Sequence, residues 1–339
     1  MKRNFVRPYL FSFTLLVGAV LLSIAVGSVF IPPAEVVRIL FGQAPSSAQG
    51  DVYHAIVTEL RLPRMVMLIL VGAALAGSGG SYQGLFRNPL ADPYLIGVAS
   101  GAGLGAILAM TYKGPSSTLG LFLIPLAAFI TGVLTVFLVY ELARVGKTVP
   151  VTNLILAGVA ASSFATALTS FLMINATGEL RRAVVWMLGG ATLTGWPAVF
   201  AVFPYILLGL TILLIMGHPL NVLQFGDEQA QQLGMRVGTA RILIVAAATL
   251  ATAAAVAFAG IIAFVGLVVP HLIRLTWTSD YRHLLPLSMI GGAAMLLISD
   301  VIARTILSPQ VLPVGIVTAL IGAPFFFWVL RRAKQQNYW

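Results

Sequence analysis

Long apolar stretches recur along this 339-residue sequence, and they constrain its fold more than any other feature. Each runs for about eighteen residues or more, enough for a helix to cross about 30 Å of hydrocarbon. Hydrophobic residues make up 59% of the chain and charged residues 9%, which is more apolar surface than a soluble core can use. The runs are continuous rather than alternating, so they indicate helices and not barrel strands. The sequence therefore predicts an all-α polytopic membrane protein.

About ten of these stretches can span a membrane as helices, and they form a single transmembrane domain over residues 1–339. The first run is longer than the apolar part of a cleavable secretory signal, and many more spans follow it. The segment 261–276 is short and contains Pro270, and Trp186 to Ala191 suggests an extra partial helix. The approximate bounds of the ten spans are 9–31, 64–84, 94–112, 119–142, 152–173, 196–216, 240–259, 261–276, 284–306 and 313–331.

Positive charge indicates the orientation of the chain. If both termini are cytoplasmic, the inside segments carry thirteen Lys and Arg residues and the outside segments seven, in agreement with the positive-inside rule. We therefore expect a multi-pass protein of the cell (inner) membrane, surrounded by membrane lipid, with cytoplasmic N- and C-termini. The net charge of +10 is scattered between the spans and not gathered on one face, so no nucleic-acid partner is expected.

Small residues repeat at a spacing of four in two of the spans. Such a stripe is flat, and it lets a neighbouring helix approach closely. We therefore expect close helix packing along both stripes. They are formed by Gly72, Ala76 and Gly80 in the second span, and by Gly97, Gly101 and Gly105 in the third.

A polar segment interrupts the apolar pattern in the second half of the chain, where residues 224–241 read QFGDEQAQQLGMRVGTAR. Asp227 and Glu228 follow Gly226 and predict a helix start, because carboxylates are favourable near a helix N-terminus. Gly234 predicts the end of this helix. A short polar helix cannot sit in lipid, and the flanking spans could be joined by fewer residues. It is either a solvated loop helix or a contact for another protein.

Three further features are informative, and the last two of them each leave two interpretations open. Residues 88–93 read NPLADP and predict a rigid turn, because its prolines fix φ and restrict the preceding residues. Asp300 and Arg304 lie four residues apart, so they form an intrahelical ion pair or leave Arg304 for outward recognition. His271 follows Pro270 and either caps its helix or belongs to a functional site.

Several motifs are missing from the sequence. It has no G-x-x-x-x-G-K-[ST] loop for ATP, no H-E-x-x-H and no G-x-S-x-G, so we expect no enzyme activity and no catalytic residue. It has no cysteine and only four dispersed histidines, so we expect no metal site and no cofactor. Few charges lie within the spans, which argues against a secondary transporter acting without an ATPase.

Seven stretches between about Arg61 and the last span stand out in order and spacing. They are RLPR, GAALAGSGGSYQGLFRNPLADPYLIGVASGAGLGA, GDEQAQQLGM, AGIIAFVGLVVPHLIRL, DYRHLLPLS, SDVIAR and LPVGIVTALIGAPFFFWVL. Together they resemble the FecCD-type permease family of bacterial ABC importers, whose members move ferric siderophores, haem and cobalamin. The resemblance implies a type II ABC importer permease fold, a homodimer with the pathway on its two-fold axis, two cytoplasmic ATPase subunits and an external substrate-binding protein.

The resemblance also implies roles for particular residues. A cytoplasmic segment over about 221–238 is similar to the coupling helix that docks into the ATPase. Asn88 and Leu90 match a cytoplasmic gate, with a second gate at 147–152. The coupling residues are Gly226, Asp227, Glu228, Gln229, Ala230, Leu233 and Gly234. The residues that match arginines contacting glutamates of the binding protein are Arg61, Arg64 and Arg304. The fifth span would line the pathway with Ser162, Ser163, Thr166, Thr169 and Ser170.

The expected cargo is an iron chelate, with ferric siderophore first and haem or cobalamin as alternatives by the same mechanism. No residue in the sequence identifies the cargo, because the binding protein selects the ligand in this family. The sequence departs from the family at one place, where Val311 precedes Leu312-Pro313 and the family usually has glutamate. Any docking or gating detail that depends on this carboxylate is in doubt.

Overall fold

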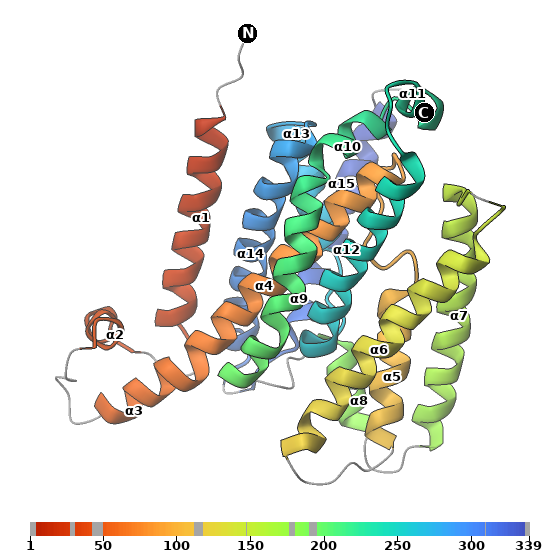
Figure 1. The fold of residues 1–339 in the computed structure, drawn as a ribbon. Helices are drawn as coiled ribbons and strands as arrows, with labels where there is room; N and C mark the ends of the chain where they lie inside the picture. The colour runs from red at the N-terminus through yellow and green to blue at the C-terminus, as the bar shows by residue number, and fades with distance from the viewer. Residues whose placement is uncertain are drawn as a thin grey trace.

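The chain folds into a bundle of helices (Figure 1). The computed structural model describes residues 5–27, 31–42, 50–111, 118–146, 148–175, 180–189, 195–308 and 310–335. The helices are α1 (Val6–Ala25), α2 (Pro33–Leu40), α3 (Gly50–Ala55), the π-helical η1 (Ile56–Arg61), α4 (Leu62–Leu85), α5 (Val98–Thr111), α6 (Thr118–Leu142), α7 (Val151–Asn175), α8 (Leu180–Met187), α9 (Trp196–Ile215), α10 (Gly217–Leu223), α11 (Asp227–Gln232), α12 (Val237–Ala259), α13 (Val265–Thr276), α14 (Tyr281–Thr305) and α15 (Val314–Gln335).

The all-α polytopic fold is confirmed. Within the described ranges, seven helices are long and apolar enough to cross a membrane: α1, the continuous helix Gly50–Leu85, α6, α7, α9, α12 and α14. Shorter apolar helices, α5, α13 and part of α15, occupy the other three expected spans. The partial helix expected from Trp186 to Ala191 is wrong in position: the structure has a short helix, α8, at Leu180–Met187, and residues 190 and 191 lie outside the described residues.

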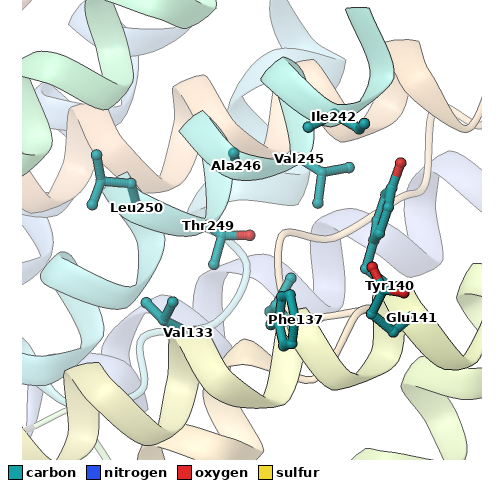
Figure 2. Close-up of a pocket in the computed structure, with 10 residues that line it drawn as sticks. Val133, Phe137, Tyr140, Glu141, Ile242, Val245, Ala246, Thr249 and Leu250 are labelled. Atoms are coloured by element: carbon teal, nitrogen blue, oxygen red, sulfur yellow. The ribbon is translucent and has the colours of Figure 1, made fainter. Parts of the chain in front are cut away.

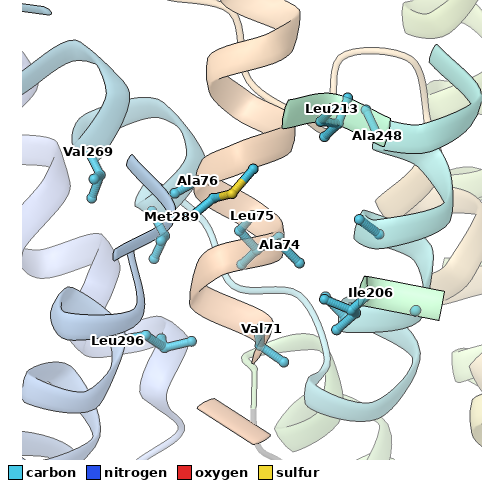
Figure 3. Close-up of a cluster of buried hydrophobic side chains, with 14 of the residues drawn as sticks. Val71, Ala74, Leu75, Ala76, Ile206, Leu213, Ala248, Val269, Met289 and Leu296 are labelled. Carbon is cyan, nitrogen blue, oxygen red and sulfur yellow. The ribbon is translucent and has the colours of Figure 1, made fainter. Parts of the chain in front are cut away.

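The core of the bundle forms around α4, which packs against α14, α12, α13 and α9. Its apolar side chains meet those of α9, α12 and α14 in one cluster (Figure 3). A Cβ atom at Gly72 would collide with the backbone of Gly292 in α14, and one at Gly79 with the carbonyl of Gly266 in α13. The small-residue stripe of α4 therefore permits close helix packing, as expected.

Two non-helical segments, 86–97 and 260–264, precede the short helices α5 and α13. The Tyr94 hydroxyl joins them, since it donates to the Ile262 carbonyl at 2.9 Å and accepts from the Ile262 N–H at 3.3 Å. Because the pairing satisfies backbone groups inside the protein, irregular backbone is tolerated there. The expected spans 94–112 and 261–276 were wrong at their starts, since Gly97 and Phe264 adopt positive φ, at 88° and 71°, and interrupt the helices.

The bundle has two distinct ends (Figure 1). The start of α1, the end of α15, α10 and α11 lie at the upper end, which we call the α11 end. Helices α2, α3 and α8 lie at the opposite end. The first and last described helices therefore begin and end on the same side of the bundle.

Candidate coupling and transport site

The polar segment forms a short helix where the sequence predicts one. Gly226 precedes α11 with φ of 101° and Gly234 follows it with φ of 85°, and glycine adopts such angles without steric penalty. Ala230 is fully buried, whereas Leu233 is 69% exposed. Glu228 and Gln229 are exposed as well, so α11 packs one face on the protein and leaves the other free.

Helix α11 is fastened to the bundle by a buried arginine of α12. Arg241 donates from Nη2 to Asp227 Oδ2 at 2.8 Å, and from Nη1 to the Val149 carbonyl at 2.7 Å. Asp227 is the first residue of α11, and Val149 lies just before α7. Charge-assisted bonds of this kind are stronger than neutral ones, so α11, α12 and the start of α7 are held together.

Asn221 of α10 and Gln224, the residue that follows this helix, connect the polar segment to two other elements. Gln224 donates to the Gly84 carbonyl of α4 at 2.9 Å, and Asn221 donates to Asp280 Oδ1 at 2.6 Å. Hydrogen bonds from Arg282, and then from Asn221, hold the pKa of Asp280 well below its usual range. The polar segment is therefore hydrogen-bonded to α4 and to the start of α14 as well as to α12.

The Asn88–Pro93 sequence forms the expected turn. The Asn88 side-chain oxygen accepts from the Leu90 N–H at 2.9 Å, and Asp92 Oδ1 accepts from the Tyr94 N–H at 2.8 Å. Both are side-chain-to-backbone turns, which fix the backbone locally. Asn88 is exposed and Leu90 is half-buried. Burial raises the pKa of Asp92 to about 6.

Hydroxyl side chains of α7 line a small cavity of about 180 Å³ beside α5 and α8. Thr166, Thr169 and Ser170 contribute to it, together with Ser100 of α5. Thr169 and Ser170 donate to carbonyls of their own helix at 2.7 and 2.9 Å, so the cavity wall is only mildly polar.

The other two hydroxyls expected in the pathway lie outside that cavity lining. Ser163 is exposed and donates to the Val159 carbonyl at 2.9 Å. Ser162 lies against Gly97, where an added Cβ would be 3.3 Å from its Oγ.

An apolar groove of about 490 Å³ separates α6 from α12 (Figure 2). Val133 and Phe137 of α6 face Val245 and Ala246 of α12 across it. Tyr140 also lines the groove and lies at the right of Figure 2. The two helices are in contact with each other, and the groove opens between them at the level of these side chains.

Two of the three arginines expected to face outward pair with one buried carboxylate at the end opposite α11, and the third, Arg61, lies with Arg304 beside Gly27. Arg64 donates to Asp300 Oδ1 from Nη2 at 2.7 Å and from Nε at 3.0 Å. Arg304 Nε lies 2.8 Å from Asp300 Oδ2, so the intrahelical ion pair exists. Asp300 is fully buried, and the Arg64 side chain is 22% exposed.

These arginines also bind the end of α1. Arg61 donates to the Ile24 carbonyl and, at 3.1 Å, to that of Ala25. Arg304 donates to the Ser23 carbonyl at 3.2 Å. Cations are favourable at a helix C-terminus, so the cluster anchors α1. The docking role of Arg61, Arg64 and Arg304 stays a prediction.

The position where the family has glutamate lies beside this cluster. Val311 is exposed, and the next residue, Leu312, donates its N–H to the Ala303 carbonyl at 3.0 Å. Asp300 supplies the carboxylate that Arg304 pairs with in this chain.

Comparison with known proteins places the chain in a family. The model of the FecCD transport family matches residues 15–332. The chain belongs to this family. FecCD proteins are permease subunits of ABC importers, which are transport components. The vitamin B12 import permease BtuC of Klebsiella pneumoniae is 39% identical and aligns over 97% of this chain and 95% of its own length.

Two other matches agree with this assignment. The hemin transport permease HmuU of Yersinia pestis is 36% identical over 86% of this chain and 88% of its own. A solved structure described as an inward-facing metal-chelate type ABC transporter superposes with a TM-score of 0.83, at 30% identity, covering 97% of this chain and 99% of that one.

The candidate residues of this FecCD permease occupy separate places. The α11 residues and the turn at Asn88 and Leu90 lie near one end, and the arginines lie at the other. The sequence did not predict the contacts of Arg241 or the pairing of Asp300 with Arg64. One signal for Arg241 was available, since an arginine at the start of an apolar span must find polar partners when it is buried.

Proposed function

We propose that this FecCD permease imports a ferric siderophore, driven by two cytoplasmic ATPase subunits that act on α11. The observation that carries the proposal is the two-sided character of α11. Ala230 is buried against the protein, while Glu228, Gln229 and Leu233 are exposed. Phe225 and Leu233, on either side of α11, are both exposed, and aromatic and apolar side chains exposed beside polar ones outside the spans favour a protein contact. The α11 end would then be cytoplasmic, in the cell (inner) membrane.

The surroundings of α7 support a pathway beside this helix. Within the chain α7 packs chiefly on α5 and α6, and its hydroxyl side chains line the cavity beside α5 and α8. We place a second copy of the chain on this side, with the pathway between the two copies. The mildly polar wall at Thr166 and Ser170 suits the passage of a bulky chelate without tight binding.

The arginine cluster supports delivery by a binding protein. Arg64 is more exposed than Arg61 and Arg304, so it would be the first to meet a carboxylate of the partner. Bidentate pairing with carboxylate and steering by rim charge then set the docking orientation.

The cargo is tested on the binding protein that partners this permease. It is titrated with a panel of ferric siderophores, with haemin and with cyanocobalamin, following its intrinsic fluorescence. We expect tight binding of a ferric siderophore. Cobalamin is the second candidate, because a relative named for vitamin B12 import is 39% identical over nearly the whole chain. Preference for cobalamin or haemin would change the cargo and keep the mechanism.

The mechanism is tested by reconstituting the permease with its ATPase and loaded binding protein in liposomes. Uptake should require ATP. Uptake by the permease alone, without the ATPase, would contradict the proposal and favour a secondary transporter.

A further inference from the structure

Arg241 lies where three elements of the α11 end meet. Its side chain belongs to the first turn and a half of α12, is 6% exposed, and reaches two segments from different parts of the chain. Its Nη2 donates to the carboxylate of Asp227 at the start of α11, and its Nη1 donates to the carbonyl of Val149. A planar guanidinium can make both bonds in a fixed geometry, which a flexible ammonium cannot.

The Val149 contact acts on a stiff part of the backbone. Val145 and Thr148 form two backbone hydrogen bonds, at 2.9 and 3.1 Å, that close the turn after α6. The Val149 side chain is buried, and α7 begins two residues later, with Leu154 donating to the Pro150 carbonyl at 3.0 Å. A displacement of the Val149 carbonyl is therefore passed to α7 without a flexible linker.

The neighbouring contact between α6 and α12 is open. The groove of Figure 2 separates the two helices at the level of Phe137 and Val245. An apolar groove holds the helices less firmly than interdigitated side chains do. The groove leaves room for α6 to move relative to α12 at this level, and Arg241 connects α12 to the segment after α6 by its bond to Val149.

We propose that Arg241 is a positioning residue that transmits movement of α11 to α7. ATPase motion would displace α11, Asp227 would carry the displacement to Arg241, and Arg241 would pull on Val149 and so on the helix that carries Thr166 and Ser170. This inference rests on the proposed function, because it takes α11 as the element moved by the ATPase. It adds a route from that element to the pathway.

The test follows the exposure of α7 in the full complex. The chain has no cysteine, so Ser163→Cys introduces a single thiol on an exposed position of α7. Permease, ATPase and binding protein are assembled in nanodiscs, and the rate of maleimide labelling is measured with and without ATP and vanadate. The variants are Arg241→Met, Arg241→Lys and Asp227→Ala, each in the Ser163→Cys background. The matched control is Arg7→Met, which removes an exposed arginine at the start of α1.

We expect ATP and vanadate to change the labelling rate in the Ser163→Cys protein and in the control. The change should be lost in Arg241→Met and reduced in Arg241→Lys, while the ATPase still binds. Asp227→Ala should lose it too, and combining it with Arg241→Met should add nothing, because both break one connection. If Arg241→Met does not assemble, Asp227→Ala, which leaves the Arg241–Val149 bond in place, decides the question.

Two results would overturn the inference in different ways. A labelling change that persists in Arg241→Met, or in Asp227→Ala with the ATPase bound, rejects the role of Arg241 alone. A Ser163→Cys protein that shows no change with ATP and vanadate rejects the proposed function, and this inference with it.

Discussion

Replacing Asp300 should destabilise the permease strongly. Its carboxylate is fully buried and faces two guanidinium groups, at 2.7 Å from Arg64 and 2.8 Å from Arg304. Asp300→Asn would leave the buried Arg304 cation without its counter-ion. Breaking a buried ion pair from one side costs about 3–5 kcal/mol. The Arg64 contribution is smaller, because water screens its partly exposed side chain.

The assay is the apparent melting temperature of the detergent-solubilised protein. A loss of this size corresponds to a shift on the order of 5–10 °C for a chain of this length. The matched control is Glu141→Gln, because Glu141 and Arg144 form an exposed pair at 3.6 Å and such pairs contribute about 0–1 kcal/mol. Adding Arg304→Met to Asp300→Asn should recover part of the loss. Equal melting temperatures for Asp300→Asn and Glu141→Gln would refute the reasoning.

Three further predictions concern other parts of the molecule. Burial raises the pKa of Asp92 to about 6, above about 3.9 in an unfolded chain. Between these two pKa values the folded protein keeps a proton on Asp92 that the unfolded chain has lost. The free energy of unfolding should therefore fall as pH rises from about 4 to about 6. Asp92→Asn should flatten this dependence in thermal-shift measurements at several pH values. Gly79→Ala would press a Cβ on the Gly266 carbonyl and should cost about 1–3 kcal/mol, whereas Gly18→Ala, with nothing within 4 Å, should not lower the melting temperature. Arg64→Gln should lower the affinity of the binding protein for the permease and make that affinity less salt-dependent. An unchanged affinity in surface plasmon resonance would argue against docking at Arg64.

Local patterns in the sequence were sufficient for much of the fold. Continuous apolar runs predicted the helices, because length and hydropathy decide whether a segment can cross lipid. Asp227 and Glu228 predicted the start of α11, because carboxylates are favourable near a helix N-terminus, and Gly234 predicted its end, where the chain adopts a positive φ. The stripe at Gly72 predicted close packing of α4, because only a residue without a Cβ fits there.

Contacts between distant residues were not predictable in the same way. Arg241 and Val149 are 92 positions apart, and Arg64 and Asp300 are 236 apart. No local pattern encodes such pairs. The starts of α5 and α13 also differ from expectation. The apolar residues before Val98 and Val265 predicted helix, but the Tyr94–Ile262 pairing holds these segments in irregular backbone.

The central claim is that an ATPase drives transport through α11, and one uptake measurement tests it most directly. Glu228→Ala with Leu233→Ala removes an exposed acid and an exposed apolar side chain from α11. The control, Asp51→Ala with Val52→Ala, does the same on exposed α3 at the other end. ATP-driven uptake of the cargo identified by the binding-protein titration is measured in liposomes. We predict uptake at the wild-type rate in the control and loss of uptake in the α11 variant, which should still fold and dimerise. Wild-type uptake by the α11 variant would contradict the claim.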